Sequence, residues 1–361
     1  MYEKLVRIII FVAIIGIIGC SAPENGTKWS KQGKEYYSKR QYEKAKEYFH
    51  KALESDLKTH GEEHPDVIRD WNNLGLVCLE LGQYENAVKY FEKSKNWNNL
   101  GSAWKALGQY KKAIEYYEKD LALDLKTVGD QDPSTATTWN NLGSVYDSLG
   151  QYKKAIDYYE KALPVILKTD GPEHPTVIKL WNNLGMAWKA VGEYETAIKY
   201  IEKALNTSLK TYGDSHPLVA ASWNHLGVVS EAAGENDKAI EYYENALAIF
   251  IKIYGQEHPN VAKLRNNLGN TWVSLGQFEK AIEYFEKALA SDLKTYGEAH
   301  PATAANWNSL GNAWFYLKKY KTAIEYYKKA LNALEKTLGK DHPYTKTTKK
   351  SLSIAQKKLS H

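Results

Sequence analysis

Apolar residues along most of this chain follow the period of an α-helix, and the pattern itself recurs at a fixed interval. From Trp139 to Tyr146, apolar or small residues fall at positions i, i+3, i+4 and i+7, which is the stripe of an amphipathic helix. Gly150 ends this stripe, and a second helical stripe runs from Tyr152 to Leu167. One period therefore predicts two amphipathic helices joined by a short turn.

The motif Trp-Asn-Asn-Leu-Gly marks each period. Its copies are mostly 42 residues apart, and one interval is shortened to 26. A proline stands six residues before most copies, which fits the first position of a helix because the missing N–H has no intrahelical partner there. Repetition at this period predicts stacked units that each touch only their neighbours. The copies begin at Trp29, Trp71, Trp97, Trp139, Trp181, Trp223, Arg265 and Trp307.

The motif carries a family resemblance. Trp-x-x-Leu-Gly-x-x-Tyr, followed by Ala155, Tyr159 and Ala162, resembles the tetratricopeptide repeat (TPR), a helix-turn-helix unit whose usual period is about 34 residues. The longer period, with Leu-Lys-Thr-Tyr-Gly-x-x-His-Pro after the second helix, resembles the 42-residue form of kinesin light chains and many bacterial proteins. The resemblance implies an all-α fold, a right-handed α-solenoid of about eight TPR repeats with a C-terminal capping helix.

The repeats divide the chain into segments. Residues 28–343 are expected to form the solenoid, and the lysine-rich residues 344–361 to form the capping helix. The repeat at 71–96 is shortened, so we expect a tight turn at about Lys95 and Asn96; a helix fused across them is the alternative. Arg265 replaces an anchor tryptophan, and its stem is expected to cover the packing site while the guanidinium reaches solvent.

Residues 1–19 are predicted to be a signal peptide. Lys4 and Arg7 precede an apolar run that is too short to span a bilayer but fits a signal-peptide core. The run ends Ile-Ile-Gly-Cys, which resembles a bacterial lipobox; this implies cleavage before Cys20, lipidation of its thiol, and a short tether within residues 20–27. Ser21 is not the aspartate that retains many such proteins at the inner membrane, so we expect a lipid anchor in the outer membrane of a bacterial envelope. An uncleaved signal anchor is the alternative.

Composition and motif spacing point away from several functions. The net charge of +5 is small for 361 residues, and lysines are interleaved with glutamates, so nucleic acid is not an expected partner. Histidines precede prolines once in most repeats, but packed helices lie about 8–10 Å apart, so these histidines cannot share one metal. No nucleophile lies near a base at motif spacing, and no glycine-rich phosphate loop occurs. We therefore predict no enzymatic activity, metal, cofactor or small-molecule substrate.

The first asparagine of the motif recurs in seven copies although asparagine is a poor helix former. On an ideal helix it lies beside the packed stripe, on the face that lines the concave surface of TPR arrays. An amide offers donors and an acceptor, so a row of amides can pair with the backbone of an extended peptide. A structural or merely inherited role is the alternative. The predicted ladder is Asn72, Asn98, Asn140, Asn182, Asn224, Asn266 and Asn308.

Groove positions that differ between repeats are expected to set specificity. These are the positively charged Arg69, Lys105, Lys179, Lys189 and Lys263 and the aromatic Phe315 and Tyr316. They favour a partner segment with acidic and apolar residues. The sequence thus predicts a membrane-anchored scaffold that binds protein partners or extended peptides in its concave groove, in an oligomeric state left open. The alternative is a cell-wall or glycan-associated lipoprotein in envelope maintenance, because tryptophan and tyrosine can stack on sugars.

Overall fold

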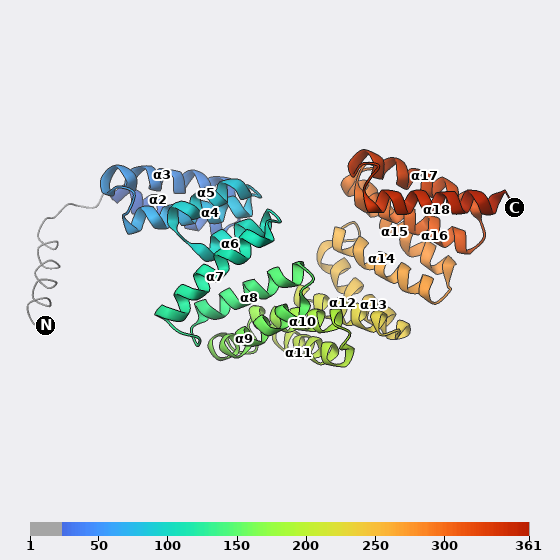
Figure 1. Cartoon of the computed structure of the whole chain (residues 1–361), viewed down its shortest axis with the longest axis horizontal. Helices are drawn as coiled ribbons and strands as arrows, with labels where there is room; N and C mark the ends of the chain where they lie inside the picture. Colours follow the sequence, from blue (N-terminus) through green and yellow to red (C-terminus); the bar gives the residue numbers. More distant parts are fainter. Residues whose placement is uncertain (1–23, 361) are drawn as a thin grey trace, which may run out of the picture. The chain divides into compact units, whose positions relative to one another are not determined.

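The computed structural model describes residues 24–360, and these form 17 α-helices. They belong to two compact units, Met1–Val145 and Tyr146–His361, and the boundary falls within α8 (Pro133–Ser148). Within each unit, helices consecutive in the chain pack as hairpins (Figure 1). The predicted all-α class of paired helix-turn-helix repeats is confirmed.

The first unit contains the shortened repeat. Its helices before α8 are α2 (Glu24–Ser38), α3 (Tyr42–His60), α4 (Pro65–Glu80), α5 (Tyr84–Ser94), α6 (Trp97–Ala106) and α7 (Tyr110–Thr127). Residues 24–27, which the sequence assigned to the tether, are the first turn of α2. Gly26 lies so close to α3 that a Cβ there would stand 1.8 Å from Oδ1 of Asp56, so this turn is packed against the first hairpin.

The second unit contains regular repeats. After α8 its helices are α9 (Tyr152–Asp170), α10 (Pro175–Ala190), α11 (Tyr194–Tyr212), α12 (Pro217–Ala232), α13 (Asn236–Tyr254), α14 (Pro259–Ser274), α15 (Phe278–Tyr296), α16 (Pro301–Tyr316), α17 (Tyr320–Thr337) and α18 (Pro343–Leu359). The even-numbered helices are the first helices of the repeats.

A histidine caps the N-terminus of most first helices. His174 has an extended backbone, and its Nδ1 accepts a hydrogen bond of 3.3 Å from the N–H of Thr176, while Pro175 takes the first helical position. This bond satisfies one of the donors that a helix start leaves without a partner. The repeated His-Pro pair is therefore a helix-start device. The same cap is made by His64, His216, His258, His300 and His342.

The Leu-Gly step of the motif lets the two helices of a hairpin approach closely. A Cβ on Gly75 would lie 2.4 Å from the ring of Phe91, and one on Gly227 would lie 2.6 Å from the ring of Tyr243. Phe91 and Tyr243 are fully buried. Glycine is therefore required at this position because any side chain would displace the aromatic ring that fills the hairpin core.

The chain turns tightly at the shortened repeat. Helix α5 ends at Ser94, Lys95 adopts φ 54° in the left-handed region, and α6 begins at Trp97. The side chain of Asn96 accepts a 3.0 Å hydrogen bond from the N–H of Asn99 and so caps α6. The tight turn predicted at Lys95 and Asn96 is therefore present, and the fused helix is not.

The side chain of Arg265 is buried, which differs from the prediction. Its side chain is only 7% exposed, and the guanidinium points inward. It donates to the carbonyls of Gln256 and Lys287, at 3.0 and 3.4 Å, and to Oγ of Ser291 at 3.2 Å. The expectation of a solvent-exposed guanidinium was wrong, because local carbonyl groups satisfy its donors inside the hairpin.

Candidate functional site

One side of the first helices forms the candidate site, which we call the first-helix wall in each unit. It consists of the side of each first helix that carries the positions equivalent to Lys263 and Asn266. In the first unit, a recess of about 80 Å³ lies between α2 and α4 and includes Lys34 and Asn73. The wall is therefore indented between consecutive first helices.

Two recesses in the second unit contain residues predicted from the sequence. One of about 320 Å³ is lined by Lys263 and Asn266 of α14, with Asp292 of α15 also contributing. Another of about 150 Å³ lies between α16 and α18 and is lined by Phe315 and Tyr316. The structure thus brings the predicted amide and lysine together in one recess and the two aromatic residues together in the other.

Most amides of the asparagine ladder are bonded to the next first helix. In three places, the second asparagine of the following motif donates through Nδ2 to the ladder Oδ1. A ladder amide thus pins consecutive first helices in register, which sequence reasoning gave only as the alternative role. These bonds join Asn99 to Asn72 at 2.8 Å, Asn141 to Asn98 at 2.9 Å and Asn267 to Asn224 at 3.3 Å.

Asn98 lies at the centre of the most complete of these networks. Its Nδ2 donates to Oδ2 of Asp120 at 3.0 Å and to Oγ1 of Thr138 at 2.7 Å. Thr138 in turn donates to the same Asp120 oxygen at 2.8 Å. Asn98 therefore ties α6 to both helices that follow it.

The other ladder residues differ in how far they are engaged. Asn182 is 3% exposed and donates to Oγ of Ser222 at 3.0 Å, whereas Oδ1 of Asn308 accepts from Thr348 at 3.2 Å. Oδ1 of Asn140 is buried and has no hydrogen-bond partner within residues 24–360. Asn266 is half-buried in its recess. The ladder is therefore not a uniform row of open amides.

The predicted positive charges also divide into two groups. Arg69 is held by three carboxylates: it contacts Asp56 at 3.4 Å and Asp70 at 3.2 Å, and it also bonds Asp66. Lys105 donates to Oγ of Ser144 at 2.5 Å. Arg69 thus contributes no excess positive charge to the wall.

Three predicted lysines of the second unit make no ion pair with a described residue. Lys179 and Lys263 are exposed and Lys189 is half-buried. The recess of Lys263 is lined by one carboxylate, that of Asp292, which is 5% exposed and whose pKa is raised by burial. This end of the wall is therefore the part best suited to an acidic partner.

His225 stands where most repeats have the second asparagine. Its Nδ1 is buried without a hydrogen-bond partner among the described residues, and Oδ1 of Asn182 on the preceding first helix is in the same condition. Burial, with a smaller contribution from the nearby charge of Lys263, lowers the pKa of His225 to about 4. One inter-helix bond of the ladder is therefore missing at this position.

One trio of residues in the described part has metal-ligand chemistry. Potential ligand atoms of His60, His64 and Asp66 all lie within 4.8 Å of one another. The two imidazoles are stacked, with centroids 4.0 Å apart, His64 caps α4, and Asp66 is bonded to Arg69. Because stacked rings direct their lone pairs in parallel and two of the three groups are already engaged, we assign no metal to this trio.

A family profile of the tetratricopeptide repeat matches residues 27–96, 94–168, 176–240, 219–294, 273–336 and 302–361. The chain belongs to the tetratricopeptide repeat family. This is a family of scaffolds that are typically non-catalytic, and TPR domains bind protein and peptide partners. No sequence among curated proteins matches the chain.

Several solved structures resemble this protein. A putative kinesin light chain from Podosopora anserina with nearly identical repeats is 27% identical, and the match covers 57% of this chain and 97% of that one with a TM-score of 0.51. BtubC (BKLC) of P. vanneervenii is 25% identical over 68% of this chain and 93% of its own, with a TM-score of 0.50. A Rap protein complexed with Competence and Sporulation Factor is 14% identical, and the match covers 93% of this chain and 99% of that one with a TM-score of 0.57. At this identity the likeness shows a shared fold alone. The expected likeness to kinesin light chains is confirmed.

The predicted lipidation site, Cys20, lies outside the described residues. Among residues 24–360, no helix combines the length and the hydrophobicity needed to cross a bilayer.

Proposed function

We propose that this TPR protein is a non-enzymatic, lipid-anchored scaffold that binds an extended segment of a partner protein along its first-helix wall. The main support is the recess that joins Lys263 and Asn266, because a charge that can select an acidic side chain lies beside an amide that can pair with a peptide backbone. The Rap protein described above is one TPR-fold structure that holds a bound factor.

Within this proposal, the asparagine ladder has two roles. Asn98 and Asn182 mainly hold consecutive helices together, since their amide nitrogens donate to neighbouring side chains. At Asn72 and Asn224 the described bonds use only Oδ1, so Nδ2 remains to donate to a peptide carbonyl. Asn266 combines an amide with a recess, so we place the strongest backbone contact there.

The aromatic recess would hold an apolar side chain of the same partner. Tyr316 is 55% exposed and its ring stacks on Phe278 at 5.2 Å, so the ring is fixed without being covered. Four of the anchor tryptophans are unsuited to sugar stacking, because Trp71, Trp139, Trp181 and Trp307 are only 6% to 9% exposed. This burial favours a protein partner over the glycan alternative.

Affinity capture with the full chain in neutral detergent tests the wall. Wild type is compared with a double variant, Lys263→Ala with Asn266→Ala, and with Lys210→Ala, which removes an equally positive side chain that is 80% exposed and bonded to the loop residue Glu173. The proposal expects a protein partner that is lost with the double variant and kept with the control. Capture of cell-wall glycan that both variants retain would support the alternative instead.

Membrane anchoring has a separate test. We propose that Cys20 is lipidated and that the protein is held in the bacterial cell envelope, at the outer membrane rather than the inner, because Ser21 follows the cysteine. Metabolic labelling with palmitate should be lost in Cys20→Ala and kept in Cys78→Ala, which changes the buried free cysteine. Labelling that persists in Cys20→Ala would reject the anchor without affecting the wall.

A further inference from the structure

A recurring side-chain contact links three regular hairpins of the second unit to the loops before them. A lysine near the end of the second helix reaches the loop residue that lies 37 positions earlier. This contact fastens the loop to the hairpin that follows it. It joins Lys210 to Glu173 at 3.4 Å, Lys252 to Oγ of Ser215 at 2.7 Å, and Lys294 to Glu257.

The last complete hairpin lacks this contact. The lysine is present as Lys336, but the loop residue 37 positions earlier is Ala299, whose methyl group can accept no hydrogen bond. Among the residues that the structure describes, Lys336 has no hydrogen-bond or ion-pair partner. The repeat pattern thus leaves the ammonium group of Lys336 without the acceptor that three equivalent lysines have.

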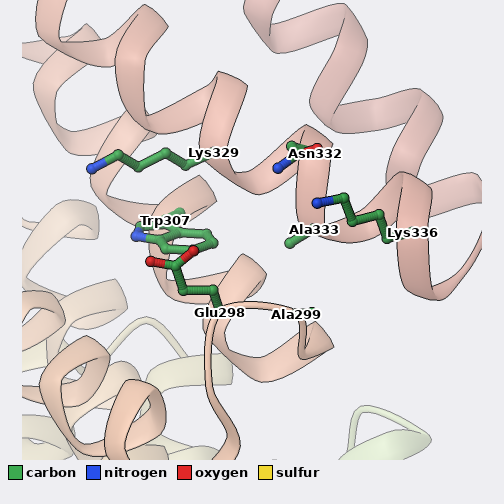
Figure 2. A pocket seen from close by; sticks show the side chains of 7 residues that line it. All are labelled: Glu298, Ala299, Trp307, Lys329, Asn332, Ala333 and Lys336. Carbon is green, nitrogen blue, oxygen red and sulfur yellow. The ribbon is translucent and has the colours of Figure 1, made fainter.

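A pocket of about 190 Å³ lies at this position (Figure 2). Lys329, Asn332 and Lys336 line it from one face of α17, at the i, i+3 and i+7 spacing of a helix. Trp307 of α16 is 6% exposed and forms an apolar part of the lining together with Ala333. Glu298 contributes one carboxylate, so the two lysines leave an excess of one positive charge.

We infer that this pocket binds the carboxylate of a glutamate side chain presented by another protein. The carboxylate would take the place that Glu257 occupies beside Lys294, and would pair with Lys336 and with an amide hydrogen of Asn332. The methylene groups of the glutamate would lie against Trp307 and Ala333. Free phosphate and acetate have no methylene groups, so they would not make this apolar contact. This site is formed by a loop and a second helix, so it is separate from the first-helix wall.

A small probe can test the pocket in the full chain in neutral detergent. Blocked glutamate, N-acetylglutamic acid methylamide, is titrated while the indole N–H resonance of Trp307 is followed, with the assignment made in Trp307→Phe. Binding in the millimolar range is expected of a ligand of this size. Blocked glutamine of the same shape should leave the resonance unchanged, and inorganic phosphate should shift it less.

Variants separate the pocket from general surface charge. Ala299→Glu supplies the missing loop carboxylate and should abolish binding, and Lys336→Gln should weaken it about tenfold. Glu298→Gln removes the opposing charge and should strengthen binding about threefold. Lys294→Gln is the matched control, because its lysine is equivalent but already paired, and it should bind as wild type does.

Three results would overturn the inference. They are the absence of saturable binding to wild type, equal binding by Ala299→Glu and wild type, or a phosphate response that matches glutamate in size and in its dependence on Lys336. All of the changed side chains except Trp307 are exposed, so unchanged far-UV circular dichroism is expected and confirms that each variant is folded.

Discussion

The same substitution at two equivalent positions of the ladder should have different effects on stability. Asn98 makes three hydrogen bonds to side chains of neighbouring helices, whereas Asn266 lines an open recess and makes no comparable bond among the described residues. Replacing each with alanine compares a structural amide with one proposed to bind a partner, in the same motif and on the same side of a first helix.

The expected size follows from the bonds that are lost. Each net hydrogen bond contributes about 1 kcal/mol, with a charged acceptor such as Asp120 at the upper end, so the three bonds of Asn98 sum to about 3 kcal/mol. Water can replace part of this at a half-buried site, and alanine favours a helix over asparagine by about 0.5 kcal/mol. We therefore expect Asn98→Ala to lower the free energy of unfolding by about 2 kcal/mol, and Asn266→Ala to leave it unchanged or raise it by about 0.5 kcal/mol.

Hydrogen exchange measured by mass spectrometry is the appropriate assay. The chain has two compact units, so a single denaturation midpoint need not report on both helices. Exchange should accelerate in α6 of Asn98→Ala and stay unchanged in α14 of Asn266→Ala. Equal losses at both positions would refute the division of the ladder into two roles, and no loss at Asn98 would mean that water fully replaces its network.

Three further changes are predicted from single side chains. His225→Asn should restore the missing bond to Asn182 and raise the free energy of unfolding by about 1–2 kcal/mol at pH 7. Wild type should lose stability as the pH falls from 6.5 towards 4, because the folded state holds the imidazole neutral. Urea titrations should show no such loss in the variant. Burial raises the pKa of the Asp70 carboxyl from 3.8 to about 6, so its ionisation lowers the stability of the fold as the pH rises through this range. Asp70→Asn should therefore unfold at a higher urea concentration than wild type at pH 7, and the difference should vanish near pH 4. Pro164 lies inside α9 and is exposed, so Pro164→Ala should raise the melting temperature by adding a backbone hydrogen bond. Ala248→Pro at the equivalent place in α13 should lower it. Unchanged melting temperatures in both variants would show that a backbone hydrogen bond at this helical position does not contribute to stability.

The helices could be predicted from the sequence because their signals are local. Proline at the first helical position, glycine after the last, and the apolar stripe between them each act within one helix. The turn at Lys95 and Asn96 was predictable for the same reason, since the residues that would extend the helices are missing from the chain. These features do not require knowledge of how one repeat sits on the next.

The orientation of the ladder amides was not predictable in this way. A bond such as that from Asn141 to Asn98 joins residues 43 positions apart, and its existence depends on the packing of two helices in different repeats. The sequence did hold one clue, because both asparagines of the motif recur together, as expected of a donor and an acceptor on neighbouring helices. The inward path of Arg265 likewise depends on carbonyl groups of a loop and another helix, which composition cannot reveal.

These contacts change where specificity should be sought in the array. A residue that recurs because it bonds the next repeat is constrained by stacking, so it cannot vary to suit one partner. The asparagine ladder meets this description at Asn98 and Asn182, and there the poor helix propensity of asparagine is offset by bonds between helices. Departures from the repeat are free of that constraint, and Lys263 and Ala299 are two of them. A partner is therefore more readily selected by residues that differ between repeats than by residues that recur from repeat to repeat.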